Sequence, residues 1–157
     1  MNEYTAHPNI KLCTTLEQFD HLVGEWDIDI TDSQYWSHIV HGRVSIQPAE
    51  DGAFLIWRSN YEQPGPPGAV YFVGGDESAK VATILYFDVR GVSRVLQTSF
   101  ENGIWLVWRD APGFDQRLTG QVSSEGKTMQ VRVEKSLDGS NWTLDFYINY
   151  TRRMNDV

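Results

Sequence analysis

Two histidines, His38 and His41, are the first residues in the chain whose types and spacing could do chemistry. On a helix, residues three apart share a face, and two imidazoles placed in this way could bind a metal ion. The alternation of apolar and polar residues around them indicates a strand instead, on which the two side chains point to opposite faces. We therefore predict no metal site, and we place His38 on the apolar face together with Val40 and Val44.

An imidazole on an apolar face either has a buried partner or faces a polar cavity, and its pKa suits proton transfer near neutral pH. Tyr61 lies on a similar apolar face and could supply a second proton donor. If both face one cavity, His38 and Tyr61 are candidate catalytic residues for a cyclisation, isomerisation or dehydration of an apolar, for example polyketide-like, substrate. Core packing is the alternative role of each, and the sequence leaves open whether the protein is an enzyme.

The segment WRDAPGFDQR, residues 108–117, sets two arginines and two aspartates around a Pro-Gly pair. Proline presets φ and glycine accepts the positive φ that follows, so Ala111-Pro112-Gly113 is predicted as the tight turn between two neighbouring strands. We interpret the charges as cross-strand pairs that hold the register of this hairpin. A polar site at a cavity mouth is the alternative, in which Arg109 would bind an anionic group.

The elements that must position these residues are almost all strands. Residues 14–23 have apolar side chains at helical spacing and are followed by a glycine. From Glu25 onward the apolar period is two, and turn residues such as Asp51-Gly52 and Asp138-Gly139 interrupt it at short intervals. We predict an all-β fold, an antiparallel up-and-down β-barrel of about ten strands with one short N-terminal helix. A two-sheet sandwich is the alternative.

Length and charge set the broad class of the protein. The 157 residues fit one domain, with 1–13 as an N-terminal extension and 14–153 as the barrel. A formal net charge of −8 argues against nucleic acid and membrane surfaces as partners. The first residues lack the pattern of a secretory signal, and the single cysteine, Cys13, suits a reducing compartment. We expect a cytoplasmic protein.

A barrel of about ten strands is wider than one that its side chains just fill, so a cavity with aromatic walls is expected. The predicted ligand-binding residues are Trp36, Trp57, Trp108 and Arg109. Asp88, just before a glycine turn, is predicted to accept hydrogen bonds from turn amides rather than to act as a base. The sequence has no Gly-x-Ser-x-Gly, HExxH or phosphate-binding loop, and no cofactor is predicted.

The motif Gly24-Glu25-Trp26 after a short helix, together with Tyr150-Thr151-Arg152 near the end, resembles the calycin superfamily of lipocalins and fatty-acid-binding proteins. The resemblance implies that Trp26 closes one end of the barrel and that Arg152 stacks across it as a structural pair. Further motifs look like those of an uncharacterised bacterial family of lipocalin-like barrels; they are Tyr86-Phe87-Asp88, Trp108-Arg109-Asp110 and Asp138-Gly139 with Trp142.

The related nitrobindin-like barrels bind haem through a histidine late in the chain. All four histidines of this sequence lie before the middle, so that position has no match and haem is not predicted. The function predicted first is the binding of a small hydrophobic molecule in the barrel lumen. The alternatives are the enzyme described above and a homodimeric structural barrel without a ligand.

Overall fold

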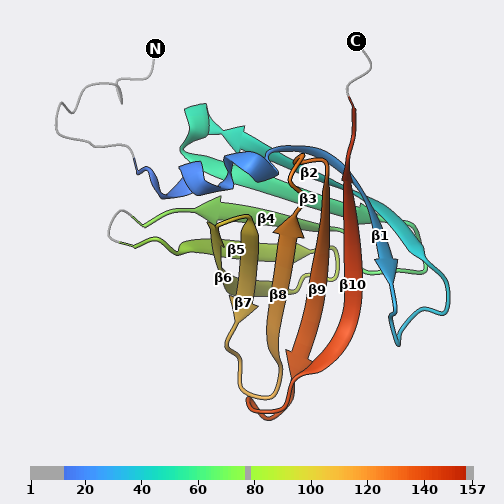
Figure 1. Ribbon diagram of the computed structural model, residues 1–157. Helices are drawn as coiled ribbons and strands as arrows, with labels where there is room; N and C mark the ends of the chain where they lie inside the picture. The colour runs from blue at the N-terminus through green and yellow to red at the C-terminus, as the bar shows by residue number, and fades with distance from the viewer. Residues whose placement is uncertain (1–12, 77–78, 155–157) are drawn as a thin grey trace.

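The computed structural model describes residues 13–76 and 79–154, which form a closed barrel of ten antiparallel strands (Figure 1). Consecutive strands pair with each other, and β1 closes the barrel by pairing with β10. The strands are β1 (Gly24–Thr31), β2 (Val40–Ala49), β3 (Phe54–Tyr61), β4 (Ala69–Gly74), β5 (Ala82–Asp88), β6 (Ser93–Glu101), β7 (Ile104–Arg109), β8 (Asp115–Val122), β9 (Thr128–Ser136) and β10 (Thr143–Arg152). The predicted up-and-down barrel is therefore confirmed.

The short N-terminal helix is also present, as a 3-10 helix, η2 (Thr15–Leu22), and a second turn of this kind, η3 (Glu50–Gly52), links β2 and β3. Leu16, Phe19 and Leu22 of η2 are buried, as the helical spacing of its apolar residues predicted. The predicted extension, residues 1–13, lies outside the described residues apart from Cys13. None of the described helices is long and apolar enough to cross a membrane.

The core of the barrel follows from the alternation of side chains along each strand. On β1, Trp26, Ile28 and Ile30 are buried while the residues between them are exposed. Most of the other strands repeat this pattern, and the inward rows form one apolar cluster that η2 joins from one end. The inward side chains pack closely beneath η2 and leave a larger space toward the other end of the barrel.

We call the end of the barrel that η2 covers the closed end. The Gln18 side chain fastens η2 there, because its Nε2 donates to the Lys80 carbonyl at 2.8 Å and its Oε1 accepts from the Phe100 amide at 2.9 Å. Only a void of about 20 Å³ remains at this end, between Phe19, Leu22 and the surrounding strands. The opposite end, beyond which the chain passes from β1 to β2, is called the open end.

Candidate functional site

A cavity of about 350 Å³ lies inside the barrel toward the open end. Its wall consists of Tyr35, Trp36, Trp57, Tyr61, Gly65, Pro66, Pro67, Tyr71, Tyr86, Arg90, Arg94, Leu96, Val107, Gln116, Leu118, Val133, Phe146, Ile148 and Tyr150. The volume is at the small end of the range for ligand pockets, and an apolar lining with a few polar groups is typical of such sites. This cavity is the candidate functional site.

Aromatic rings in mutual contact form much of the wall. Trp57 stacks on Tyr71 with ring centroids 3.8 Å apart and planes 10° apart, and Tyr71 meets Tyr86 edge-on at 5.0 Å. Such contacts orient the rings against one another, so that the wall presents both ring faces and ring edges. The Trp57 indole N–H is buried and has no hydrogen-bond partner among the described residues.

Three phenols of the wall stay protonated far above neutral pH. Burial raises the pKa of Tyr61, and it raises the pKa of Tyr71 and Tyr150 well above the ordinary range. Ser59, which lies near Tyr61 and Tyr71, opposes the rise only in part, and its own buried Oγ has no partner within hydrogen-bonding distance. The cavity thus offers neutral hydrogen-bond donors.

The loop between β1 and β2 folds over the mouth of the cavity. Trp36 packs against Phe146 of β10 with centroids 6.4 Å apart, and Tyr35 lies beside Trp36 at 5.6 Å. Lys135 of β9 donates a hydrogen bond of 2.8 Å to the Tyr35 hydroxyl, which fastens the loop to a strand that lies next to β10. Trp36 therefore lines the cavity from a loop and not from a strand.

A network of hydrogen bonds around Asp88, at the end of β5, holds Arg90 at the mouth of the cavity. Its buried carboxylate accepts hydrogen bonds from the Tyr86 hydroxyl at 2.7 Å, the Arg90 guanidinium at 2.7 Å and the amides of Arg90 and Val92. The Arg90 guanidinium in the first place, with these other hydrogen bonds, holds the pKa of Asp88 well below its usual range. Asp88 thus accepts hydrogen bonds from turn amides, as the sequence predicted, and its carboxylate stays charged.

The predicted position of His38 on the apolar face of a strand is wrong. His38 lies in the β1–β2 loop before the first residue of β2, is exposed and is not part of the cavity wall. His41 is exposed on β2, where its Nδ1 contacts the Asp29 carboxylate, which raises the pKa of His41. His38 and Tyr61 therefore do not face one cavity. Among the described residues, no three His, Cys, Asp or Glu side chains gather where they could hold a metal.

The predicted inward position of Trp108 is also wrong. Trp105 and Val107 are the buried residues of β7, while Trp108 is half-buried on the other face and does not line the cavity. Arg109 is not in the cavity wall either, and its Nη1 donates to the Phe114 carbonyl at 3.3 Å. Of the predicted ligand-binding residues, Trp36 and Trp57 are in the wall and Trp108 and Arg109 are not.

The WRDAPGFDQR segment does form a hairpin turn between β7 and β8. The Phe114 amide donates to the Ala111 carbonyl at 2.9 Å, and Gly113 has a φ of 90°. The charges do not pair across the hairpin as predicted. Asp115 accepts the Ala111 amide at 2.7 Å, and the Arg117 side chain forms an ion pair of 3.0 Å with Glu134 of β9.

At the closed end, Trp26 and Arg152 form the contact that the calycin resemblance implies. The Arg152 guanidinium lies 4.1 Å from the centre of the Trp26 ring. Its three nitrogens donate to backbone carbonyls, at 2.6 Å to His21, 2.7 Å to Val23 and 3.1 Å to Gly126. The pair joins the last strand to the helix and to a turn, and its structural role remains a prediction.

Gly24 completes this arrangement because it leaves room for the arginine. Its φ is +137°, and a Cβ at this position would lie 2.6 Å from Nη1 of Arg152. A side chain at residue 24 would therefore displace the guanidinium from the Trp26 ring. This close approach gives a physical reason for the glycine of the Gly24-Glu25-Trp26 motif.

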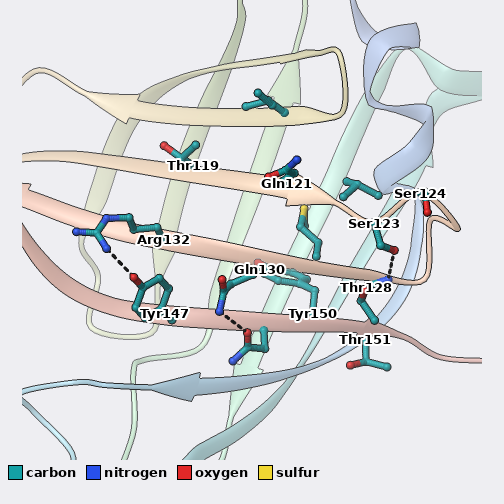
Figure 2. A pocket seen from close by; sticks show the side chains of 14 residues that line it. Thr119, Gln121, Ser123, Ser124, Thr128, Gln130, Arg132, Tyr147, Tyr150 and Thr151 are labelled. Carbon is teal, nitrogen blue, oxygen red and sulfur yellow. Dashed lines mark hydrogen bonds between the residues drawn. The ribbon is translucent and has the colours of Figure 1, made fainter.

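A second hollow, on the outer face of β7 to β10, is larger at about 790 Å³ but is open to solvent, and most of its lining residues are polar. Figure 2 shows that its side chains bond to one another: Arg132 donates to Tyr147 at 2.6 Å, and Gln130 donates to Asn149 at 3.3 Å. Because these polar groups have partners, the hollow presents a solvated sheet face. The enclosed aromatic cavity remains the better candidate.

Arg94 and Tyr71 belong to the cavity wall and were not among the predicted site residues. A signal for Arg94 exists in the sequence, since it alternates in phase with Leu96 and Thr98, both of which are buried on β6. A charge on the inward phase at the beginning of a strand indicates the mouth of a barrel.

The fold has a solved counterpart. The crystal structure of Rv2717c from M. tuberculosis matches with a TM-score of 0.63 at 10% sequence identity, covering 92% of this chain and 100% of that chain. No protein-family model matches the sequence, and no curated protein matches it. The likeness at this identity establishes the barrel fold, and membership of the calycin superfamily stays a prediction.

Proposed function

We propose that the barrel binds a small, largely hydrophobic molecule in its lumen. The observation that carries the proposal is the aromatic cavity of about 350 Å³, which lies in a barrel whose other end is packed to a void of about 20 Å³. Protein interiors are normally packed without such space, so the cavity is a feature that needs a reason.

The unpaired polar atoms support the same proposal. Buried polar groups in native proteins almost always have hydrogen-bond partners, and an unpaired donor costs about 1–3 kcal/mol. Trp57 lines this cavity and also the small void at the closed end, and its buried indole N–H has no partner among the described residues. Ser59, whose buried Oγ also has no partner, lies next along the same face of β3. A ligand that carries an acceptor atom, such as a carbonyl or ether oxygen, would satisfy the indole.

The test uses native mass spectrometry of the purified protein to search for a retained small molecule, and isothermal titration calorimetry with 2-naphthamide as a neutral two-ring probe. Leu118→Trp should fill the cavity, because Leu118 is a partly buried residue of its wall. Leu106→Trp makes the same change on the exposed face of β7 and is the matched control. We expect saturable binding that Leu118→Trp weakens at least tenfold and Leu106→Trp leaves unchanged. Equal binding by both variants, or no binding by the parent protein, would contradict the proposal.

A second proposal is self-association through the outer face of β3 to β6. Ile56, Phe72, Leu85 and Val95 form a cross-strand row there, and the last three are exposed. Phe87 adds to this surface at 6.1 Å from Phe72. The row is uncharged in a chain of net charge −8, so a second copy of the chain would meet least repulsion on this face.

Analytical ultracentrifugation tests this second proposal. We expect a dimer that Leu85→Lys converts to a monomer, because the change would bury a charge in the interface. Leu137→Lys, in the exposed β9–β10 turn, is the control and should leave the dimer intact. A parent protein that sediments as a monomer at high concentration would exclude this interface.

A further inference from the structure

The charges of the cavity wall are all of one sign. Two arginines, Arg90 and Arg94, line the cavity, whereas no aspartate or glutamate is among the described residues of its wall. The chain as a whole has 21 acidic and 13 basic residues, so this lining departs from the average surface. Four phenols of the wall, Tyr61, Tyr71, Tyr86 and Tyr150, have raised pKa values, so they remain neutral and add no negative charge.

Arg90 is neutralised within the protein. Its guanidinium forms an ion pair with the buried Asp88 carboxylate at 2.7 Å, and its Nε lies 3.2 and 3.3 Å from the two carboxylate oxygens. This bidentate geometry is the strongest form of the arginine–carboxylate pair. Arg90 therefore contributes structure at the mouth and little free positive charge.

Arg94 differs because no described carboxylate lies within ion-pair distance of it. Its Nη1 donates to Oε1 of Gln116 at 3.1 Å, and a guanidinium has five N–H donors in all. Two rings fix its position, since the guanidinium carbon lies 5.9 Å from the centre of Tyr86 and 5.8 Å from that of Phe114. Arg94 is thus a cation held in place at the cavity, with donors to spare.

The deeper wall fits flat rings better than a flexible chain. Trp57, Tyr71 and Tyr86 present faces and edges at fixed angles, which favours edge-to-face or offset contacts with a ligand ring. A rigid two-ring molecule also loses less conformational freedom on binding than an alkyl chain of similar area. The small volume of about 350 Å³ agrees with a compact ligand.

We infer that the lumen selects compact aromatic acids, with the carboxylate held by Arg94 at the mouth and the rings packed against the stacked Trp57 and Tyr71. This inference rests on the proposed function, because it specifies the ligand class of the same cavity. Arginine matches a carboxylate with two parallel N–H donors, which lysine cannot do.

Paired probes of one shape separate the two proposals. We would measure the dissociation constants of 2-naphthoate and of 2-naphthamide, its neutral analogue, for the parent protein and for Arg94→Gln, Arg94→Lys and Arg43→Gln. Arg43 lies exposed on the outside of β2 and controls for the loss of one positive charge. Thermal unfolding of each variant verifies that it is folded.

We expect the parent protein and Arg43→Gln to bind naphthoate about tenfold or more tightly than naphthamide, as for a hydrogen bond to a charged group. Arg94→Gln should abolish the preference by weakening naphthoate alone, and Arg94→Lys should restore it in part. Equal affinity of the parent protein for both probes would overturn the inference and leave the proposed function standing. Binding of neither probe would overturn both, and a preference for naphthoate that survives Arg94→Gln would overturn the inference.

Discussion

The two ends of the barrel use the same residue types in opposite ways. At the closed end, the Trp26 indole N–H donates to the Leu22 carbonyl at 2.9 Å, and the three nitrogens of Arg152 donate to three carbonyls. In the wall of the cavity, the Trp57 indole N–H has no partner among the described residues, and Arg94 has one amide oxygen as its hydrogen-bond acceptor. At the closed end the indole and every guanidinium nitrogen have a carbonyl partner, whereas the indole in the cavity wall has none among the described residues and the arginine has one acceptor.

Because of this difference, we expect the closed end to contribute most to stability and the open end to ligand binding. Paired donors and close packing, which leaves a void of about 20 Å³, stabilise the closed end. Both buried apolar area and paired hydrogen bonds favour the folded state. Unused donors and a cavity of about 350 Å³ cost stability at the open end. Under the proposed function a bound ligand would recover this cost, and changes at the two ends should therefore have separable effects.

Trp26→Ala should have the largest effect on stability. Trp26 is completely buried and lies beneath Arg152, and replacing such a core aromatic typically costs about 3–5 kcal/mol. Urea unfolding followed by circular dichroism measures the free energy of unfolding. A loss below about 1 kcal/mol would show that the closed end is not the stable end of the barrel.

Arg152→Met should cost about 2 kcal/mol, since it removes three charge-assisted hydrogen bonds to carbonyls while keeping a long apolar side chain over Trp26. The adjacent Arg153 is the matched control, because its ion pair with Asp27 is long, at 3.8 Å, and exposed. Arg153→Met should change the free energy of unfolding by less than about 0.5 kcal/mol. Equal losses in the two variants would remove the special role of Arg152.

Asp88→Asn should cost about 1–2 kcal/mol at neutral pH and progressively less in acid. Because Arg90 and the hydrogen bonds around it depress the pKa of Asp88 in the folded state, its contribution is fully present above the ordinary carboxyl pKa of about 4. The contribution is lost as the pH falls through the lower, folded-state pKa. Urea unfolding of both proteins from pH 7 to pH 2 should show the two stability curves converging below about pH 4.

Asp110→Asn, at an exposed position after β7, controls for the change from carboxylate to amide and should leave the whole curve unchanged. A constant difference between Asp88→Asn and the parent protein down to pH 2 would mean that the ion pair with Arg90 does not stabilise the mouth.

How well the sequence predicts the structure depends on whether apolar and polar residues alternate clearly along each strand, because this alternation shows which face is inside. The fold was predictable because β1 and β2 alternate apolar and polar residues between clear turn signals, and η2 has a helical period. On β7 the run Ile104-Trp105-Leu106-Val107-Trp108 is apolar throughout, so alternation cannot tell which face is inside. The pairing with β6, known only from the structure, places Trp105 inward and Trp108 outward.

The last strand shows a second limit of pattern analysis. A bulge between Leu144 and Phe146 shifts the register against β9, so that Asp145 is buried and lies 3.3 Å from the Lys135 ammonium group. Period-two reasoning assumes an uninterrupted strand, on which Trp142 would share a face with Phe146 and Ile148. Trp142 in fact lies outside the cavity wall and stacks with Arg117 at 4.1 Å.

Trp36→Ala should weaken ligand binding more than stability, whereas Trp26→Ala should mainly lower stability. Trp36 is only partly buried on a loop, so its loss should cost less than about 1 kcal/mol of stability. Because the ring lines the cavity and packs on Phe146, the affinity for 2-naphthamide should fall severalfold in calorimetry. Unchanged affinity together with a large loss of stability would erase the distinction between the two tryptophans.

His38→Ala should have the smallest effect, and it distinguishes the open end from its immediate surroundings. His38 lies two residues after Trp36 on the same loop, but it is exposed and outside the cavity wall. Surface substitutions of this kind usually change stability by less than about 0.5 kcal/mol, and the 2-naphthamide affinity should be unchanged. Tyr61→Phe is the informative counterpart, because Tyr61 lines the cavity and the change removes only its hydroxyl. If His38→Ala weakened binding as much as Trp36→Ala, the whole loop would act as part of the binding site and the boundary drawn at the cavity wall would be wrong.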